Sequence, residues 1–275
     1  MEKSLDLAGI SNARELGGYA VGDKYIKKGV LLRTGGLSGA SPEVVKKLRD
    51  GYRVRAVADF RMSDEVSGLP DPQIQGVKNI HLPVIEMEDY PVSDPVLFEE
   101  YQRSGGDRMK LFEMSYRSGV LGPQMYVRFL LGERGKRAYR EFFRILLEAD
   151  EGAVLWHCTD GKDRTGCAAM LLLSALGASR ETIIRDYLMT NEYNAAQIEA
   201  VRKKVSAYPM PPEKLEALLF MCGAVIESYM ANAIDTLDKH YGSVEGYLEK
   251  ELGVGTAELE QLKEKYLCNA EITEN

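Results

Sequence analysis

An apolar run, a short polar loop and a second apolar run follow one another at residues 153–173. The first run, Ala153 to Leu155, is typical of a buried strand, and the second, Ala168 to Leu173, is typical of a buried helix. Between them lies the sequence His-Cys-Thr-Asp-Gly-Lys-Asp-Arg-Thr-Gly, residues 157–166. A tight loop that joins the carboxyl end of a strand to a helix is the place where open α/β sheets bind ligands. The order therefore predicts an α/β core with a site at this loop.

The chemistry of the loop follows from its geometry and from two side chains. The N–H groups of such a loop converge, and the helix N-terminus adds a partial positive charge of about half a unit. A phosphate dianion fits this arrangement, and Arg164, six residues after Cys158, would hold it bidentately. Cys158 would then lie beneath the phosphorus, and the same positive field would acidify its thiol. These features predict cysteine-dependent phosphoryl transfer.

The loop resembles the active-site loop of the protein tyrosine phosphatase superfamily, His-Cys-x5-Arg-Thr. Its ending, Gly-Lys-Asp-Arg-Thr-Gly, is similar to that of the bacterial tyrosine phosphatases that share part of their loop sequence with phosphoinositide phosphatases. Residues 12–19 resemble the family's Asn-Phe-Arg-Asp-Leu-Gly-Gly-Tyr, from which Ala13 and Glu15 depart. The resemblance runs from about residue 7 to residue 267 and includes the segments 29–34, 58–61 with Glu65, 186–191 and 241–248.

This resemblance implies a single phosphatase domain over residues 1–275 with a tyrosine-phosphatase-like α/β fold. We expect a central, partly parallel sheet flanked by helices, and a C-terminal half that is almost entirely helical. Residues 86–132 fit this pattern poorly, because they contain several prolines and glycines and are too long for a plain connection. We interpret them as a helical insertion or lid beside the site. The alternative is a helical layer packed permanently on the sheet.

Apolar patterns and start and stop signals predict the individual elements. Strands are expected at 31–34, 54–60, 80–84 and 153–157. Ser41 followed by Pro42 predicts the start of a helix that continues to Asp50. Further helices are expected at 165–177, 180–191, 194–206, 212–231, 243–251 and 256–267, the first of them ending at Gly177.

Three residues are predicted to be catalytic. Cys158 is the nucleophile, and Arg164 stabilises the charge of the transition state. Many tyrosine phosphatases use as the acid an Asp that lies some 25–45 residues before the cysteine, but residues 113–133 contain no Asp. The resemblance favours Asp163 as the proton donor. Asp59 remains an alternative, as do the structural interpretations that Asp163 only holds the loop and that Asp59 only forms an ion pair with Arg14, Arg33 or Arg61.

A second set of residues is predicted to contact the substrate. It comprises the loop residues Thr159, Asp160, Gly161, Lys162 and Thr165, together with Asp59, Arg61 and Arg14. The resemblance implies that Lys162 favours highly charged head groups, and the alternative is a solvated lysine. Arg14 also has the alternative of supporting the loop. We expect positive charge to concentrate at the entrance of the site, where Lys162, Arg61, Arg14 and Arg33 would lie.

Charge and cysteine content exclude several other functions. The net charge of −7 argues against a broad surface for nucleic acid or acidic membrane. The four cysteines lack metal-like spacing, so we expect no metal and no cofactor. A thiol nucleophile suits a reducing compartment, and no run approaches 18 apolar residues. The sequence thus predicts a cytoplasmic protein without stable membrane insertion, with secretion as an alternative because some family members are secreted; it leaves the oligomeric state open.

The predicted function is hydrolysis of phosphotyrosine, without a metal, through a cysteinyl-phosphate intermediate. Phosphoserine, phosphothreonine and phosphoinositides are further candidate substrates, so the expected partner is a phosphorylated protein or a phosphoinositide. Two other functions remain as alternatives. One is a pseudophosphatase that binds phosphorylated partners, and the other is sulfur transfer or arsenate reduction, which also use cysteine loops.

Overall fold

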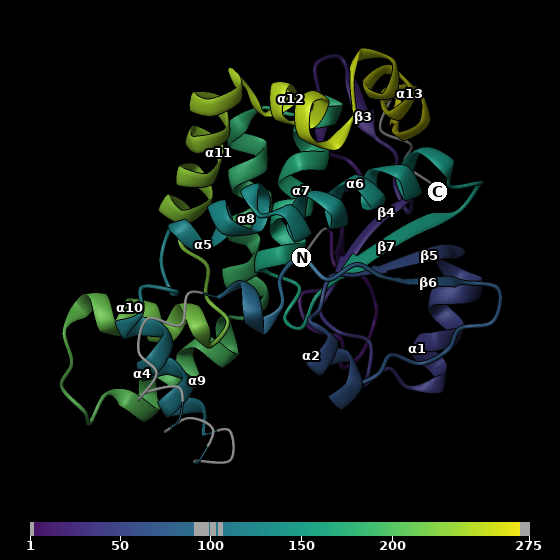
Figure 1. The fold of residues 1–275 in the computed structure, drawn as a ribbon. Helices are drawn as coiled ribbons and strands as arrows, with labels where there is room; N and C mark the ends of the chain where they lie inside the picture. Colours follow the sequence, from purple (N-terminus) through teal and green to yellow (C-terminus); the bar gives the residue numbers. More distant parts are fainter. Residues whose placement is uncertain (1–2, 91–98, 100–102, 104–106, 270–275) are drawn as a thin grey trace.

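The strand that leads into the loop, β7 (Ala153–His157), lies in the middle of the main sheet (Figure 1). The structure is a computed structural model that describes the whole chain except residues 1–2, 91–98, 100–102, 104–106 and 270–275. Within the described residues, the sheet has the order β1-β4-β7-β5-β6, formed by β1 (Arg14–Glu15), β4 (Leu31–Thr34), β7, β5 (Val54–Asp59) and β6 (Lys78–His81). Strands β4, β7, β5 and β6 are parallel, and β1 is antiparallel to β4.

Helices account for most of the remaining described residues. They are α1 (Pro42–Lys46), continued by a π-helical turn η1 (Lys47–Gly51), α2 (Ser63–Gly68), the 3-10 turn η2 (Met87–Asp89), α4 (Arg108–Arg117), α5 (Gln124–Leu131), α6 (Glu133–Glu148), α7 (Asp163–Leu176), α8 (Arg180–Tyr193), α9 (Ala195–Val205), α10 (Pro212–Met221), α11 (Glu227–Tyr241), α12 (Val244–Tyr247) with a π-helical turn η3 (Leu248–Leu252), and α13 (Thr256–Tyr266). A small antiparallel sheet joins β2 (Ala20–Val21), β3 (Lys24–Ile26) and β8 (Leu267–Cys268).

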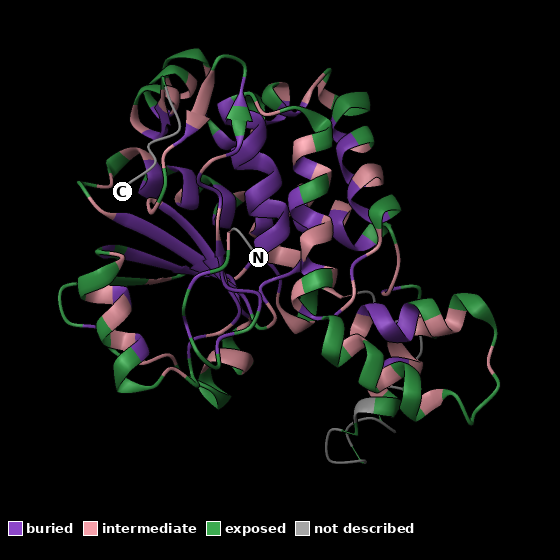
Figure 2. Cartoon of the chain, turned by 180° about the vertical axis from the view of Figure 1, so that it is seen from behind, coloured by how far each residue is buried: buried purple, intermediate pink, exposed green. Residues whose placement is uncertain are grey.

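The two faces of the main sheet pack on different layers. Trp156 and Val154 of β7 belong to a large core that includes side chains of α5 to α8 and α11 to α13. Leu155 of β7 points to the opposite face and belongs to a smaller core with Val44 of α1 and Leu48 of η1. Every residue of β7 is buried, and Figure 2 shows the central strands of the sheet in the colour of buried residues, whereas the edge strand β6 is mostly exposed. Because side chains alternate along a strand, a strand covered on both faces is apolar throughout.

Helix α7 is the central helix of the larger core. Its residues from Thr165 to Leu176 are all buried, and it ends at Gly177, whose φ of +90° gives the left-handed C-cap that glycine adopts without strain. The helix begins at Asp163, two residues before the predicted start. The predicted strands at 31–34 and 153–157 and the stop at Gly177 are confirmed, as is the partly parallel sheet.

Two element predictions are wrong. The helix expected at 212–231 is two helices, α10 and α11, separated by residues 222–226. Gly223 in this break has φ +118°, and the side chains of Asn194 and Gln197 donate to the carbonyls of Gly223 and Cys222. These contacts come from α9 and from the residue that precedes it, so the apolar pattern of 212–231 contained no sign of them. The strand expected at 80–84 occupies Lys78–His81, because pairing with β5 sets its register.

Helices α4, α9 and α10 form a lobe beside the main body (Figure 1). Phe112 of α4 packs there against Ala217 and Leu218 of α10, in a small core of its own. Part of the stretch 86–132, predicted to be an insertion or lid, lies outside the described residues. The described part contains η2, α4 and α5, and α5 packs on α7 and α11.

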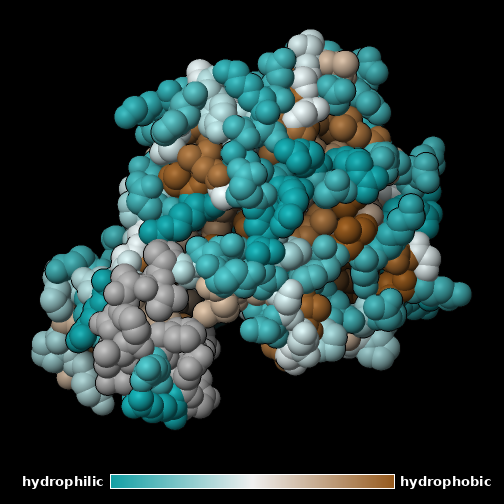
Figure 3. Space-filling view, in the orientation of Figure 1, coloured by the Kyte–Doolittle hydropathy of each residue, from teal (hydrophilic) through white to brown (hydrophobic). Residues whose placement is uncertain are grey.

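The surface view shows polar side chains over most of one face, with separate apolar patches (Figure 3). Across the described residues, no helix combines the length and the apolar character that crossing a bilayer requires.

Candidate active site

The loop between β7 and α7 turns at Gly161. The φ of this residue is +65°, and a Cβ there would lie 2.3 Å from the carbonyl oxygen of Thr34 in β4. Only glycine fits, because both the backbone conformation and the neighbouring strand exclude a side chain. Gly36 N–H also donates to the Thr159 carbonyl, so the loop is bound to the segment that follows β4.

The Gly161 carbonyl accepts hydrogen bonds from two side chains. Asn12 donates through Nδ2 at 2.7 Å, and Arg33 donates through an η nitrogen at 3.0 Å. Asn12 belongs to the N-terminal motif of residues 12–19, and Arg33 belongs to β4. The resemblance located both segments, and the structure brings them together under the loop.

Arg14, Arg33 and Asp186 form a buried charge cluster at the same place. Arg14 Nε lies 3.2 Å and an η nitrogen of Arg33 lies 2.5 Å from the Asp186 carboxylate, and both arginine side chains are fully buried. Burial alone would raise the pKa of Asp186, but the two guanidinium groups lower it. Burial and the nearby Arg14 charge lower the pKa of Arg33 to about 10. Arg14 thus lies behind the loop, and we revise its predicted role from substrate binding to support.

Arg164 is oriented by Glu65 of α2. Its η nitrogens lie 2.5 Å and 3.0 Å from the two Glu65 carboxylate oxygens, and Thr159 Oγ1 also donates to Glu65. Burial alone would raise the pKa of Glu65, but the Arg164 and Thr159 contacts lower it to about 2. Burial would lower the pKa of Arg164, yet the charges of Cys158 and Glu65 raise it well above its ordinary value. The guanidinium therefore stays charged beside Cys158.

Asp163 and Lys162 interact with each other and with the helices around the loop. Lys162 Nζ lies 2.9 Å from Asp163 Oδ2, and it donates to the Phe220 carbonyl at 2.8 Å. It also lies 3.9 Å from the centre of the Phe220 ring. Tyr126 Oη donates to Asp163 Oδ1 at 2.6 Å. Lys162 is thus neither solvated nor directed outward, and it could bind a substrate only by leaving these contacts.

Asp59 and Arg61 lie at the end of β5 and interact mainly with each other. Arg61 Nη2 lies 2.7 Å from Asp59 and 3.0 Å from Asp71, and all three side chains are largely buried. His157 Nε2 lies 2.8 Å from Asp71. Burial alone would raise the pKa of Asp71, but His157, Arg61 and the Leu37 N–H lower it. Of the arginines named in the alternative interpretation of Asp59, it pairs with Arg61, and these contacts disfavour Asp59 as a proton donor.

The same group is the one candidate for metal binding within the described ranges. The potential ligand atoms of Asp59, Asp71 and His157 all lie within 4.8 Å of one another. The guanidinium of Arg61 contacts both carboxylates, so it supplies the positive charge that a metal ion would otherwise supply. The donor set therefore does not fit a metal ion well.

Cys158 itself is 2% exposed at the base of the loop. Thr165, in the first turn of α7, is fully buried, and its Oγ1 has no hydrogen-bond partner within the described residues. Gly161 contributes its backbone, Thr159 is exposed, and Asp160 is partly exposed. The first turn of α7 thus contains one buried hydroxyl that is not used by another described residue.

The cations at the site do not accumulate as a bare positive patch. Arg164 pairs with Glu65, Lys162 with Asp163, and Arg61 with Asp59, while Asp186 compensates for Arg14 and Arg33. The positive charge that we expected at the entrance of the site is therefore offset by carboxylates. Sequence reasoning assigned no role to Glu65, Tyr126, Asp71, Phe220 and Asp186. Only Glu65 and Asp186 carried a signal, because each stands in a segment that matched the family.

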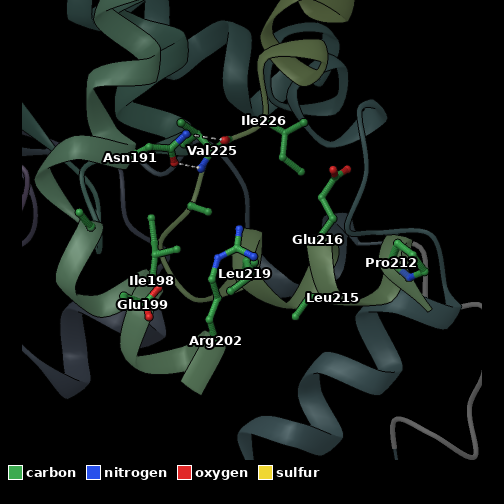
Figure 4. A pocket seen from close by; sticks show the side chains of 12 residues that line it. Asn191, Ile198, Glu199, Arg202, Pro212, Leu215, Glu216, Leu219, Val225 and Ile226 are labelled. Carbon is green, nitrogen blue, oxygen red and sulfur yellow. Dashed lines mark hydrogen bonds between the residues drawn. The ribbon is translucent and has the colours of Figure 1, made fainter. Parts of the chain in front are cut away.

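A cavity of about 590 Å³ opens between α8, α9, α10 and the break at 222–226 (Figure 4). Asn191 spans its upper edge by donating to the Val225 carbonyl at 2.9 Å and accepting from the Val225 N–H at 2.8 Å. The cavity is lined mainly by apolar side chains, among them Ile198, Leu215 and Leu219. None of the loop residues 158–164 lines it.

Comparisons with known proteins find similar sequences and one similar solved structure. The sequence profile described as "Tyrosine phosphatase family" matches residues 5–268. A Cupriavidus necator protein whose name describes it as a tyrosine-protein phosphatase is 31% identical over 253 residues, which are 91% of this chain and 84% of the relative. The triple specificity protein phosphatase PtpB of Mycobacterium tuberculosis is 26% identical over 274 residues, 94% of this chain and 97% of the relative. A solved structure of PTPMT1 in complex with PI(5)P aligns with 76% of this chain and 96% of its own, at 15% identity and a TM-score of 0.30.

The buried charge cluster predicts a large effect of Asp186→Asn. The substitution keeps the shape but leaves Arg14 and Arg33 buried without their anion, so the free energy of unfolding should fall by about 3–5 kcal/mol. Asp235→Asn is the matched control, because it breaks the exposed pair with Arg180 and should cost about 0–1 kcal/mol. Urea unfolding at neutral pH measures both. Equal losses would show that burial does not set the strength of the Asp186 cluster.

The Glu65 contact predicts a pH-dependent contribution. The folded pKa of about 2 lies below the ordinary value of 4.5, so the pair stabilises fully above pH 4.5 and its contribution is lost as the pH falls toward 2. The Tm difference between the wild type and Glu65→Gln should be larger at pH 7 than at pH 3. Glu86→Gln, which affects another acceptor beside α2, is the control and should give a smaller, less pH-dependent difference. A Glu65→Gln difference that does not change with pH would contradict the assignment.

Proposed function

The chain belongs to the tyrosine phosphatase family, and we propose that it hydrolyses phosphotyrosine through a cysteinyl-phosphate intermediate on Cys158. It is an enzyme of the protein-tyrosine-phosphatase type. One observation carries the proposal. The buried Cys158 follows β7 directly, and Arg164, the second residue of α7, is paired with Glu65, which orients its guanidinium.

In the first step, the Cys158 thiolate attacks the phosphorus of the bound ester. The S–P bond forms while the P–O bond to the leaving group breaks, and the loop N–H groups and Arg164 stabilise the charge on the equatorial oxygens. Asp163 gives its proton to the leaving oxygen, which departs as the phenol of tyrosine. The unused Oγ1 of Thr165 lies in the first turn after the loop, where it would stabilise the thiolate once that group is displaced.

In the second step, water attacks the phosphorus of the cysteinyl-phosphate. The S–P bond breaks, the Cys158 thiolate is regenerated, and the Asp163 carboxylate accepts a proton from the attacking water. Inorganic phosphate leaves, and the enzyme returns to its starting state with no cofactor required. The same carboxyl group thus acts as an acid first and as a base second.

Two observations bear on the substrate. Lys162 is bound to the Phe220 carbonyl and to Asp163, so it is not available to a second phosphate group unless those contacts break. This supports a monophosphate such as phosphotyrosine over a highly phosphorylated head group. PtpB is described as having triple specificity, and we extend the proposed range to phosphoserine and phosphothreonine as secondary substrates.

Cys158→Ser should abolish turnover and retain binding of phosphate analogues, because the loop and Arg164 remain. We expect the kcat for p-nitrophenyl phosphate to fall below about 1% of the wild-type value, since the hydroxyl is a far weaker nucleophile. Vanadate or phosphate binding should change much less, as measured by calorimetry. The wild-type rate should be the same with and without EDTA. Turnover above that limit would remove Cys158 as the nucleophile, and loss of wild-type activity with EDTA would remove the metal-independent mechanism.

Asp163→Asn should slow substrates according to their leaving groups. Phenyl phosphate, which has a poor leaving group, should lose about 100-fold in kcat, whereas activated nitrophenyl esters need less protonation and should lose much less. Asp59→Asn, measured on the same series, should show no such dependence because Asp59 is paired with Arg61. A uniform loss across the series for Asp163→Asn would mean that Asp163 only shapes the loop.

A further inference from the structure

The Asp163 carboxylate is contacted at both of its oxygens. Tyr126 Oη donates to Oδ1 at 2.6 Å, and Lys162 Nζ lies 2.9 Å from Oδ2 and 3.2 Å from Oδ1. Tyr126 lies on α5, 37 positions away in sequence. Neither the motif of the loop nor the family resemblance of the sequence pointed to this residue. Asp163 side-chain torsions would leave the carboxylate free to rotate, so these two contacts determine which oxygen points where.

The Tyr126 side chain is itself held rigidly. It is fully buried, and its ring contacts the aromatic rings of Phe129, Tyr187, Phe220 and Tyr229, which come from α5, α8, α10 and α11. Four surrounding elements therefore fix the ring, and the hydroxyl can reach Asp163 from one direction. A rigid donor of this kind is what a preorganised site requires.

The direction of the hydrogen bond is also determined. Burial raises the pKa of Tyr126 well above its ordinary value, so the phenol keeps its proton and donates it to Asp163. Tyr187 Oη lies 2.9 Å from Tyr126 Oη and accepts from the Ile226 N–H at 3.3 Å. Since the Tyr126 proton is directed to Asp163, Tyr126 Oη accepts in its 2.9 Å contact with Tyr187, whose one hydroxyl proton also has the Ile226 carbonyl at 3.2 Å as an acceptor. In a series of hydrogen-bonded hydroxyls, each hydrogen bond polarises the next.

We propose that Tyr126 is a positioning residue that acts through Asp163 and sets which carboxylate oxygen transfers the proton. This inference rests on the proposed function, in which Asp163 is the acid. Because Tyr126 donates to Oδ1, the transferable proton resides on Oδ2. After the proton has gone to the leaving oxygen, the carboxylate keeps the Tyr126 hydrogen bond at Oδ1, and the Lys162 ammonium, which lies nearer to Oδ2 than to Oδ1, balances the charge of the carboxylate. In the second step, the proton from water returns to Oδ2.

Tyr126→Phe tests this proposal, since it removes the hydroxyl and keeps the ring. We expect the kcat for phenyl phosphate to fall about 10-fold and that for activated nitrophenyl esters to fall about 2-fold or less, with vanadate affinity unchanged. Tyr247→Phe is the matched control: its buried hydroxyl donates to the Leu130 carbonyl, away from Asp163, and its loss should leave the leaving-group dependence unaltered. Tyr187→Phe should shift that dependence in the same direction as Tyr126→Phe, but less.

The double variant Tyr126→Phe/Asp163→Asn separates the two hypotheses. If Tyr126 acts through Asp163, adding Tyr126→Phe to Asp163→Asn causes no further change in leaving-group dependence. If Asp163→Asn alone shows no such dependence, the acid role and this inference both fail. If Asp163→Asn shows it and neither tyrosine variant does, only this inference fails. An additional leaving-group effect of Tyr126→Phe in the Asp163→Asn background would overturn it as well.

Discussion

Two arginines, Arg14 and Arg33, lie fully buried behind the loop between β7 and α7, and the carboxylate of Asp186 compensates for both. An unpaired charge at such depth would cost several kcal/mol, so these three residues have to assemble together. Their assembly joins β1, β4 and α8. From this cluster, Arg33 donates to the Gly161 carbonyl, and Asn12 does the same. The shape of the loop at the carboxyl end of β7 depends on this buried foundation.

The ion pair of Arg164 with Glu65 differs from this buried cluster in its exposure. Arg164 and Glu65 are partly exposed, with 12% and 23% of their side chains accessible, and they face the site where substrate would arrive. Glu65 orients the Arg164 guanidinium and leaves it partly exposed. Glu65 thereby restricts the rotation of Arg164, and in the proposed mechanism this lowers the entropy that would be lost on binding a phosphate.

The lobe of α4, α9 and α10 contacts the predicted acid, Asp163, indirectly through Phe220 of α10. Phe220, at the end of α10, supplies both a carbonyl and a ring to Lys162, and Lys162 contacts Asp163. Tyr126 also contacts Asp163 and packs on the same Phe220 ring. The orientation of the predicted acid thus depends on α5 and α10, neither of which contributes a residue to the loop.

The sequence by itself determined the loop, the strand before it and the helix after it. These are local consequences of two apolar runs, of a glycine required at φ +65°, and of the fixed spacing between Cys158 and Arg164. The N-terminal motif could be located in the same way, although its role beneath the loop could not. Only the tertiary structure decided the partner of each charged group. Glu65, Asp186 and Tyr126 meet Arg164, Arg14 and Asp163 across separations of 99, 172 and 37 positions. The division of 212–231 into α10 and α11 likewise follows from side chains of α8 and α9. Local patterns carry no information about such pairings, because they are set by which segments pack together and by the cost of leaving a buried polar group without a partner.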